Sequence, residues 1–283
     1  MLISFTNGNG ETFNIHGNYI LSPNWSGFGE VPIKHQLTKA PYQDGRTYID
    51  TVFEPRDLTI EFTIKGNNRQ EVFDRRANVA RHFNPKLGVG TLIWQQENGT
   101  IYCIDCIPKT PVFPSGDGQS YSHQIVIIQF LAPNPFWYDP MQIEKILVGF
   151  SGGWSYPWSF PMSYGQVGTQ LEVINTGNID TPVMIYLYGE VVDPRIQNLT
   201  TEEEISIILT VADGDILIIN TAFGEKAALI LSGGEYNNAF EYVDPESIFW
   251  KLKPGSNTLG YTVASEGENA QCRIYYYNRF SGV

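Results

Sequence analysis

From residue 170 onward, the chain is a succession of short apolar segments separated by turn residues, without helical periodicity. Gly, Asn, Asp and Pro stand between the segments, for example at Asp213-Gly214 and Pro254-Gly255. Short strands at regular spacing are typical of a β-sandwich or β-barrel. We therefore expect an all-β second half. Its eight strand candidates are residues 170–175, 183–189, 205–211, 216–220, 228–231, 249–252, 258–263 and 272–277.

The first half contains segments of the same kind. Residues 58–64 alternate apolar and polar side chains over seven positions, which is typical of a half-buried strand. The turn Asp44-Gly45 stands between two strand candidates and is a strong signal for a β-hairpin. We expect a β-rich first half. Its strand candidates are residues 12–15, 19–21, 33–37, 47–53, 58–64, 90–94, 101–107 and 125–131.

One segment of the first half has helical periodicity. Asn68 is a suitable N-cap residue, and Glu71 follows three positions later, as in a capping box. Asn84-Pro85 ends the pattern. The spacing predicts a single helix at about residues 69–83. Its apolar stripe consists of Val72, Phe73, Val79, Ala80 and Phe83.

Residues 132–140 contain three prolines in nine positions. Because proline interrupts strand pairing, this segment predicts an extended connector between two domains, residues 1–140 and 141–283. A length of 283 residues is sufficient for two domains. A second irregular stretch, residues 149–168, is rich in Gly, Pro, Trp and Tyr.

The formal net charge of −12 is unevenly distributed. Residues 1–140 hold 11 basic and 13 acidic residues, whereas residues 141–283 hold 7 and 17, which gives net charges of −2 and −10. An acidic surface repels nucleic-acid phosphates and anionic lipids. The charge therefore argues against specific nucleic-acid binding and against binding to a membrane surface.

The remaining composition points to a protein made in a reducing compartment. The chain has no run of about 20 apolar residues that would span a membrane, and Met1 to Gly8 lack the basic and apolar regions of a signal peptide. Three cysteines are too few for a disulfide framework. We expect folding in a reducing cytoplasm, without export by a signal peptide.

We assign no catalytic residue. Residues 149–153 match the pattern G-x-S-x-G around Ser151, but Trp154-Ser155-Tyr156-Pro157 cannot form the helix that a nucleophile elbow needs. All four histidines also precede Ser151, contrary to the order of residues in such hydrolases. Paired carboxylates for glycoside hydrolysis remain an alternative with weak support, because their pairing is set in space and not in sequence.

We likewise assign no metal or cofactor site. Cys103 and Cys106 form a C-x-x-C motif inside an apolar strand candidate, and only Cys272 remains as a third cysteine. The acidic residues 202–204 and 213–215 do not have EF-hand spacing, so we interpret them as solvated turn residues. We interpret the two neighbouring cysteines as structural.

Several aromatic residues surround the connector and the irregular stretch: Trp137, Tyr138, Trp154, Tyr156, Trp158 and Tyr164. Tyr and Trp are enriched both in buried packing and in protein interfaces, and such residues can also stack on sugars. We identify Trp154, Tyr156 and Trp158 as the candidate partner or glycan surface. A carbohydrate-binding module or lectin that contacts a cell wall is therefore the alternative function.

The order of these features resembles the distal tail protein (Dit) family of long-tailed, non-contractile bacteriophages. The resemblance rests on four places: residues 40–46 leading to 55–60, the helix at 70–83, the segment Pro-Asn-Pro-Phe-Trp-Tyr-Asp at 133–139, and the ending at 244–259 and 277–283. It spans nearly the whole chain. The last segment departs from the family pattern at Asn278, where Pro is expected.

The resemblance implies a structural, non-enzymatic protein of the virion tail, assembled in the host cytoplasm. N-terminal domains of the family build a hexameric ring at the tip of the tail tube. A C-terminal β-sandwich, galectin-like or similar to a carbohydrate-binding module, lies outside the ring. The ring joins the tube to tail-tip proteins such as the tail-associated lysin, and to baseplate or receptor-binding proteins. DNA passes through its channel without specific binding.

Overall fold

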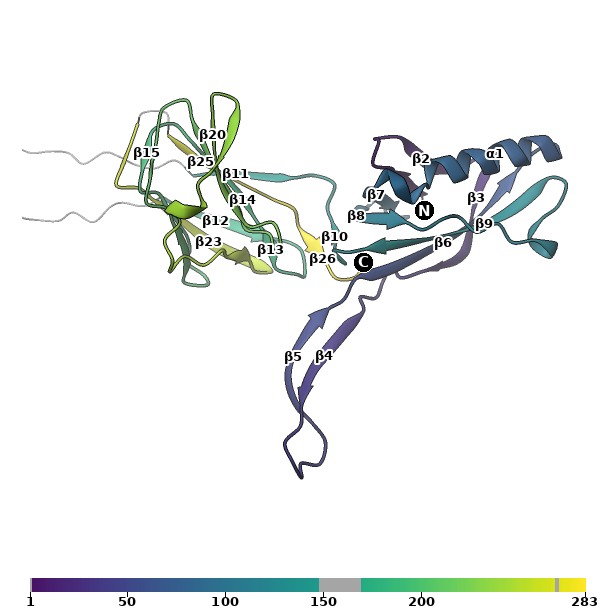
Figure 1. Cartoon of the computed structure of the whole chain (residues 1–283), viewed down its shortest axis with the longest axis horizontal. Helices are drawn as coiled ribbons and strands as arrows, with labels where there is room; N and C mark the ends of the chain where they lie inside the picture. The colour runs from purple at the N-terminus through teal and green to yellow at the C-terminus, as the bar shows by residue number, and fades with distance from the viewer. Residues whose placement is uncertain (1, 148–168, 268–269) are drawn as a thin grey trace, which may run out of the picture. The chain divides into compact units, whose positions relative to one another are not determined.

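The computed structural model describes residues 2–147, 169–267 and 270–283. They form two compact units, one of Met1–Pro140 with Phe280–Val283 and one of Met141–Arg279 (Figure 1). The sequence-based boundary had assigned residues 280–283 to the second half. They pack instead in the first unit, where Phe280 contacts Tyr102 with ring centroids 5.3 Å apart.

The main sheet of the first unit is antiparallel, with the strand order β2-β1-β7-β8-β9-β6-β3. The short strands β10 (Trp137–Tyr138) and β26 (Arg279–Phe280) join it outside this path. Alternate residues of β6 and β9 are buried, as the alternation in the sequence predicts. The strands in this order are Thr12–Ile15, Leu2–Thr6, Gly90–Gln95, Ile101–Pro108, His123–Ala132, Arg56–Lys65 and Tyr19–Ser26.

The helix α1 spans Arg69–His82. Asn68 caps it by accepting a hydrogen bond from the Glu71 backbone N–H at 2.9 Å. Val72 and Val79 are buried, and so is Phe83, which stacks on Phe5 in the core. Phe73 and Ala80 are exposed, contrary to the predicted stripe, because each lies about 100° around the helix from the buried valine that precedes it. Three 3₁₀ turns complete the described helical elements: Pro85–Leu87, Gly116–Gly118 and Phe240–Tyr242.

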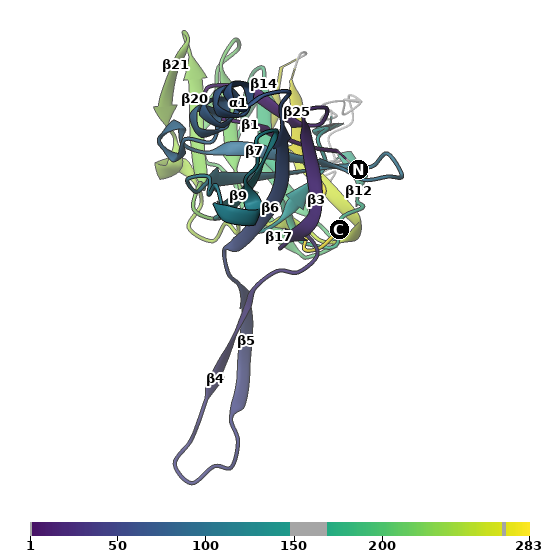
Figure 2. The same cartoon turned by 90° about the vertical axis from the view of Figure 1, so that its right-hand side faces the viewer.

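Strands β4 (Ile33–Thr38) and β5 (Thr47–Phe53) form a hairpin that pairs with no other strand of the described chain. It projects away from the main sheet of the first unit (Figure 2). The turn residues Tyr42 and Gly45 have φ angles of 64° and 76°. Glycine adopts the positive φ angle of position 45 without a steric penalty, which explains why Asp-Gly marks this turn.

The second unit is a β-sandwich. Its six-stranded sheet has the order β11-β25-β14-β19-β20-β21, and its four-stranded sheet has the order β12-β23-β16-β17. The first sheet consists of Ile143–Leu147, Gln271–Tyr276, Met184–Tyr188, Ile216–Asn220, Ala227–Ser232 and Glu235–Asn238. The second consists of Thr169–Asn175, Gly255–Thr262, Arg195–Asn198 and Glu203–Ser206. The shorter strands are β13 (Thr181–Pro182), β22 (Lys251–Leu252), β18 (Thr210–Val211), β15 (Val191–Val192) and β24 (Ser265–Glu266).

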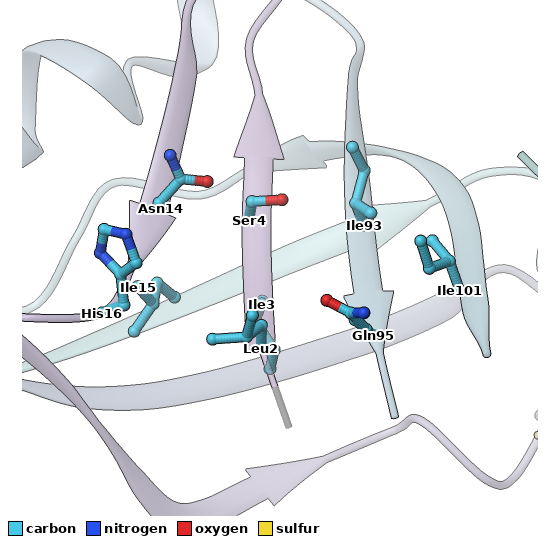
Figure 3. Close-up of a pocket in the computed structure, with 9 residues that line it drawn as sticks. All are labelled: Leu2, Ile3, Ser4, Asn14, Ile15, His16, Ile93, Gln95 and Ile101. Carbon is cyan, nitrogen blue, oxygen red and sulfur yellow. The ribbon is translucent and has the colours of Figure 1, made fainter. Parts of the chain in front are cut away.

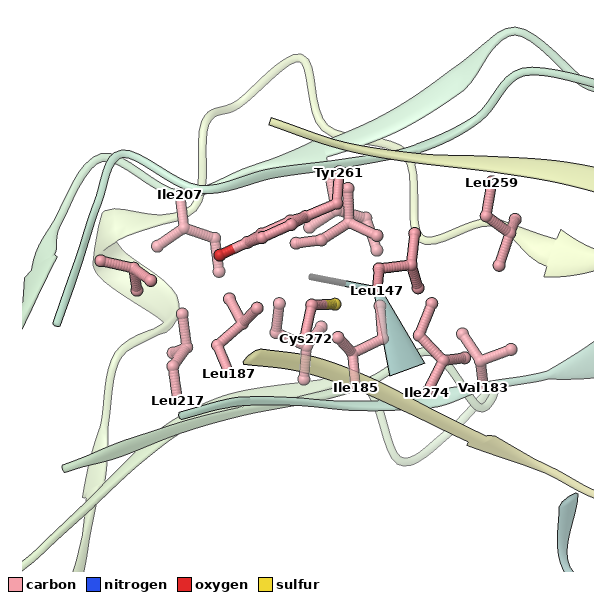
Figure 4. Packing of buried hydrophobic residues seen from close by; sticks show 14 of the residues in the cluster. Leu147, Val183, Ile185, Leu187, Ile207, Leu217, Leu259, Tyr261, Cys272 and Ile274 are labelled. Carbon is pink, nitrogen blue, oxygen red and sulfur yellow. The ribbon is translucent and has the colours of Figure 1, made fainter. Parts of the chain in front are cut away.

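The core of the sandwich lies between its two sheets (Figure 4). Ile185, Leu187 and Cys272 come from the six-stranded sheet, and Leu259 and Tyr261 from the four-stranded one. The expectation of a mainly β chain, with one helix in the first half and a β-sandwich in the second, is confirmed for the described residues. Within those residues, no helix is long and apolar enough to cross a membrane.

Candidate assembly surfaces

The β4–β5 hairpin exposes large apolar side chains on both strands. Every residue of β4 is exposed. Register pairs Ile33 with Phe53 and Leu37 with Tyr48, with a bulge between Gln36 and Leu37. Thr51, which is opposite His35, contacts both His35 and Tyr48, so Tyr48 lies on the same face as the other three apolar side chains. All four are more than 40% exposed. We call Ile33, Leu37, Tyr48 and Phe53 the hairpin face.

Polar contacts and one aromatic contact give the hairpin face a defined shape. The Thr51 hydroxyl lies 2.8 Å from His35 Nδ1 and 2.8 Å from the Tyr48 hydroxyl. At the base, Phe53 packs edge-on against Phe136, with ring centroids 5.2 Å apart. A two-stranded ribbon is marginally stable alone, and exposed large apolar side chains gathered on one face mark interaction sites. The hairpin is therefore the strongest candidate for a protein contact in the first unit.

A shallow hollow lies on the face of β1, β2 and β7 (Figure 3). Its volume is about 150 Å³, below the roughly 300 Å³ of ordinary small-molecule sites. Ser4, Asn14, His16 and Gln95 supply its polar groups, and Leu2 is one of its apolar groups. These groups do not form a nucleophile–base pair or a metal-ligand set, so the hollow offers no evident chemistry.

The connector aromatics serve packing in the first unit. Trp137 is fully buried and donates from Nε1 to the Phe28 carbonyl at 3.0 Å. Tyr138 donates from its hydroxyl to Asp105 at 2.8 Å, and burial raises the pKa of this tyrosine. The other candidate aromatics, Trp154, Tyr156 and Trp158, lie outside the described residues, as does Ser151.

The cysteines are buried in strands. Cys103 and Cys106 both lie in β8, and burial is the main cause that raises the pKa of Cys103 to about 11 and the pKa of Cys106 further. Both groups therefore remain thiols at neutral pH and are poor nucleophiles. Across the part of the chain that the structure describes, no three His, Cys, Asp or Glu side chains are grouped as metal ligands.

Sequence reasoning missed one surface of the second unit. The outward side chains of β14, Tyr186 and Tyr188, lie beside Arg273 and Tyr275 of β25. The available signal was the segment Met-Ile-Tyr-Leu-Tyr in β14, where apolar or aromatic side chains occupy both faces of a strand.

Two family models match this chain. Residues 8–130 match the phage tail protein RIFT-related domain, and residues 176–280 match the C-terminal domain of the siphovirus-type tail component. The chain belongs to the siphophage distal tail protein family. This distal tail protein is a structural component of a phage tail, as its sequence resemblance predicts.

Solved structures share its fold along the whole chain. The Dit (gp 19.1) protein of phage SPP1 matches with a TM-score of 0.69 and 11% identity over 99% of this chain and 100% of that one. A chain of the phage P2 baseplate in its activated, calcium-containing conformation matches with a TM-score of 0.55 and 13% identity over 100% of both chains. No curated protein sequence matches the distal tail protein.

Proposed function

We propose that this distal tail protein forms a hexameric ring that joins the tail tube to the tail-tip and receptor-binding components, without catalysis. The observation that carries the proposal is the hairpin face, four large apolar side chains that are each more than 40% exposed on a ribbon that pairs with no other strand of the described chain. A ring requires a heterologous contact that closes on itself. A projecting hairpin that binds the next subunit supplies such a contact.

The relatives support the tail-hub role. The SPP1 protein is described as a hub of the adsorption apparatus, and the second match belongs to a baseplate. By this analogy, the partners of the ring are the tail tube protein on one side and the tail-associated lysin or another tail-tip protein on the other. Receptor-binding or baseplate proteins then attach at the periphery.

The charge distribution fits a ring-forming first unit and a peripheral second unit. The first 140 residues carry a net charge of −2, and a nearly neutral ring wall would not retain passing DNA by counterion release. The second unit carries −10, which favours solubility at the outside of a ring. The proposed division is therefore a ring-forming first unit and a peripheral β-sandwich.

Negative-stain imaging and multi-angle light scattering of the purified protein test the proposal. Six chains of 31.9 kDa should give particles of about 190 kDa with six-fold symmetry and a central hole. A monomer at every concentration, both alone and with purified tail tube protein, would contradict a ring.

A further inference from the structure

The six-stranded sheet of the second unit is apolar on both faces. Its central strands read Met-Ile-Tyr-Leu-Tyr in β14, Ile-Leu-Ile-Ile in β19 and Ala-Ala-Leu-Ile-Leu in β20. A sheet with one solvated face alternates apolar and polar residues, whereas near-continuous apolar runs are typical of strands covered on both sides. The inward residues fill the sandwich core. Nothing in the described chain accounts for the apolar character of the outward ones.

Strand register gathers the outward residues into one surface. Tyr186 is opposite Ile218, and Ile218 is opposite Leu229. In the adjacent row, Tyr188 is opposite Ile216, which is opposite Leu231. Leu231 is in turn opposite Tyr236 on the edge strand β21. We call Tyr186, Tyr188, Ile218, Leu229, Tyr236 and Tyr275 the outer tyrosine face.

The outer tyrosine face differs from an ordinary solvated surface in its burial. Ile218 is 9% exposed, although it is not part of the core between the two sheets. Its direct strand partners on this face are Tyr186 and Leu229, both only partly exposed. Tyr236, at the edge of the sheet, is 66% exposed. The face thus combines a tightly packed centre with an accessible margin.

A polar network holds one side of this face rigid. Arg273 donates to Glu144 Oε1 at 3.1 Å and to Gln271 Oε1 at 3.0 Å. Tyr275 also donates to Glu144 Oε1, at 2.7 Å, and its ring packs edge-on against Tyr186 with centroids 5.3 Å apart. The Arg273 guanidinium lies over the Tyr188 ring at 5.1 Å. These polar groups satisfy one another's hydrogen bonds and lie on paired β-strands. The surface is therefore ordered before any partner binds.

The chemistry favours a protein over a sugar. Tyr and Arg are enriched in the cores of protein interfaces, and charged side chains are depleted there. A saccharide needs free hydrogen-bonding groups and open ring faces, but here Arg273 is paired with Glu144 and covers Tyr188. A second copy of the same face is also unfavourable, because each second unit carries a net charge of −10.

We propose that the outer tyrosine face docks a different protein of the tail, whose surface is apolar at its centre and basic at its rim. The inference rests on the proposed function, because it assigns the peripheral unit a specific partner surface. The apolar centre of the partner would cover Ile218 and the tyrosines, and its basic rim would complement the acidic unit.

Hydroxyl-radical footprinting of the full-length protein tests this proposal in four samples: the dilute isolated protein, the same protein with added cell-wall polysaccharide, the purified ring, and complete tails. We expect labelling of Tyr186, Tyr188 and Tyr236 to fall by about threefold or more in tails alone, as side chains leave water in an interface core. Phe223, which is 87% exposed in a turn beside β19, is the internal control. Equal labelling in all samples would overturn the proposal. Protection of these tyrosines already in the ring would show that the occupant is a second copy, which would also overturn the proposal. Protection of the isolated protein by added cell-wall polysaccharide would show that the occupant is a sugar, with the same consequence.

Two variants distinguish docking at the outer tyrosine face from formation of the ring. Tyr236→Ser and Ile218→Thr should leave the light-scattering mass of the ring unchanged and reduce the yield of complete tails, whereas Phe223→Ser should alter neither. Thermal unfolding of each variant identifies any loss of fold, and Tyr236→Ser is the safer variant because its side chain is exposed on an edge strand. Normal tails from both variants would contradict docking at this face. Failure of the wild type to form a ring would instead contradict the proposed function.

Discussion

The buried guanidinium of Arg56 donates a hydrogen bond to the backbone carbonyl of Ser281, 225 residues further along the chain. It also donates to the carbonyls of Gly27 at 3.2 Å and Phe28 at 3.0 Å. Burial lowers the pKa of Arg56 to about 10, which still leaves it charged at neutral pH. One cation therefore ties three distant segments of the first unit together.

Replacement of Arg56 by Met should destabilise the first unit strongly. The variant keeps most of the apolar stem but removes the buried cation and its hydrogen bonds to the carbonyls of Gly27 and Ser281, whereas the Phe28 carbonyl keeps the Trp137 donor. We expect a loss of about 2–4 kcal/mol in the free energy of unfolding. Urea unfolding followed by tryptophan fluorescence measures it. Arg81→Met is the matched control, because Arg81 pairs with Glu11 at an exposed position and should cost no more than about 0.5 kcal/mol. Equal midpoints for the two variants would contradict this role of Arg56.

A methyl group at position 282 should weaken the same contact. A Cβ on Gly282 would overlap the backbone carbonyl oxygen of Gly29, and backbone cannot yield as a flexible side chain can. We expect Gly282→Ala to cost about 1–3 kcal/mol. Gly29→Ala provides the control, since a Cβ there meets no atom within 4 Å. Thermal denaturation should show a lower Tm for the first variant alone, and an unshifted Tm would exclude close packing at this contact.

Local signals in the sequence were sufficient for the elements that local chemistry controls. Asn68 and Glu71 fix the start of the helix through a cap that spans three residues, and Asp44-Gly45 marks the hairpin turn. The alternation at residues 58–64 identifies β6 because one face of that strand is buried. Each of these signals depends only on neighbours along the chain.

Non-local structure was not readable in the same way. The apolar run at residues 205–211 predicts one strand, but β17 pairs in the four-stranded sheet and β18 pairs with β15 in another sheet. Hydrophobicity cannot mark that break, because both strands bury apolar side chains. The Arg56–Ser281 contact likewise joins segments that no periodicity connects. The outer tyrosine face required strand register, which places Tyr186 beside Ile218 and Arg273.

The contribution of Glu11 to stability should disappear in acid. Hydrogen bonds from Asn7 and then Arg81 hold the pKa of Glu11 below its usual value of 4.5. A carboxylate with a lowered pKa stabilises the fold above its unfolded-state pKa, and this stabilisation is lost as the pH falls through the folded-state value. Urea midpoints of the wild type and Glu11→Gln should therefore differ at about pH 7 and converge towards about pH 3. A difference that stays constant across this range would rule out ionisation of Glu11 as its source.

The hairpin face should decide ring formation. Leu37→Asp places a charge on the apolar side of the β4–β5 hairpin, where the proposed contact with the next subunit would bury it without a partner. We expect the variant to remain monomeric by light scattering while its circular dichroism matches that of the wild type, because Leu37 is 44% exposed in the single chain. Val52→Asp is the control: it introduces the same charge on the opposite face, beside Lys34, and should still form rings. If Leu37→Asp assembles as readily as Val52→Asp, this face of the hairpin is not the ring contact.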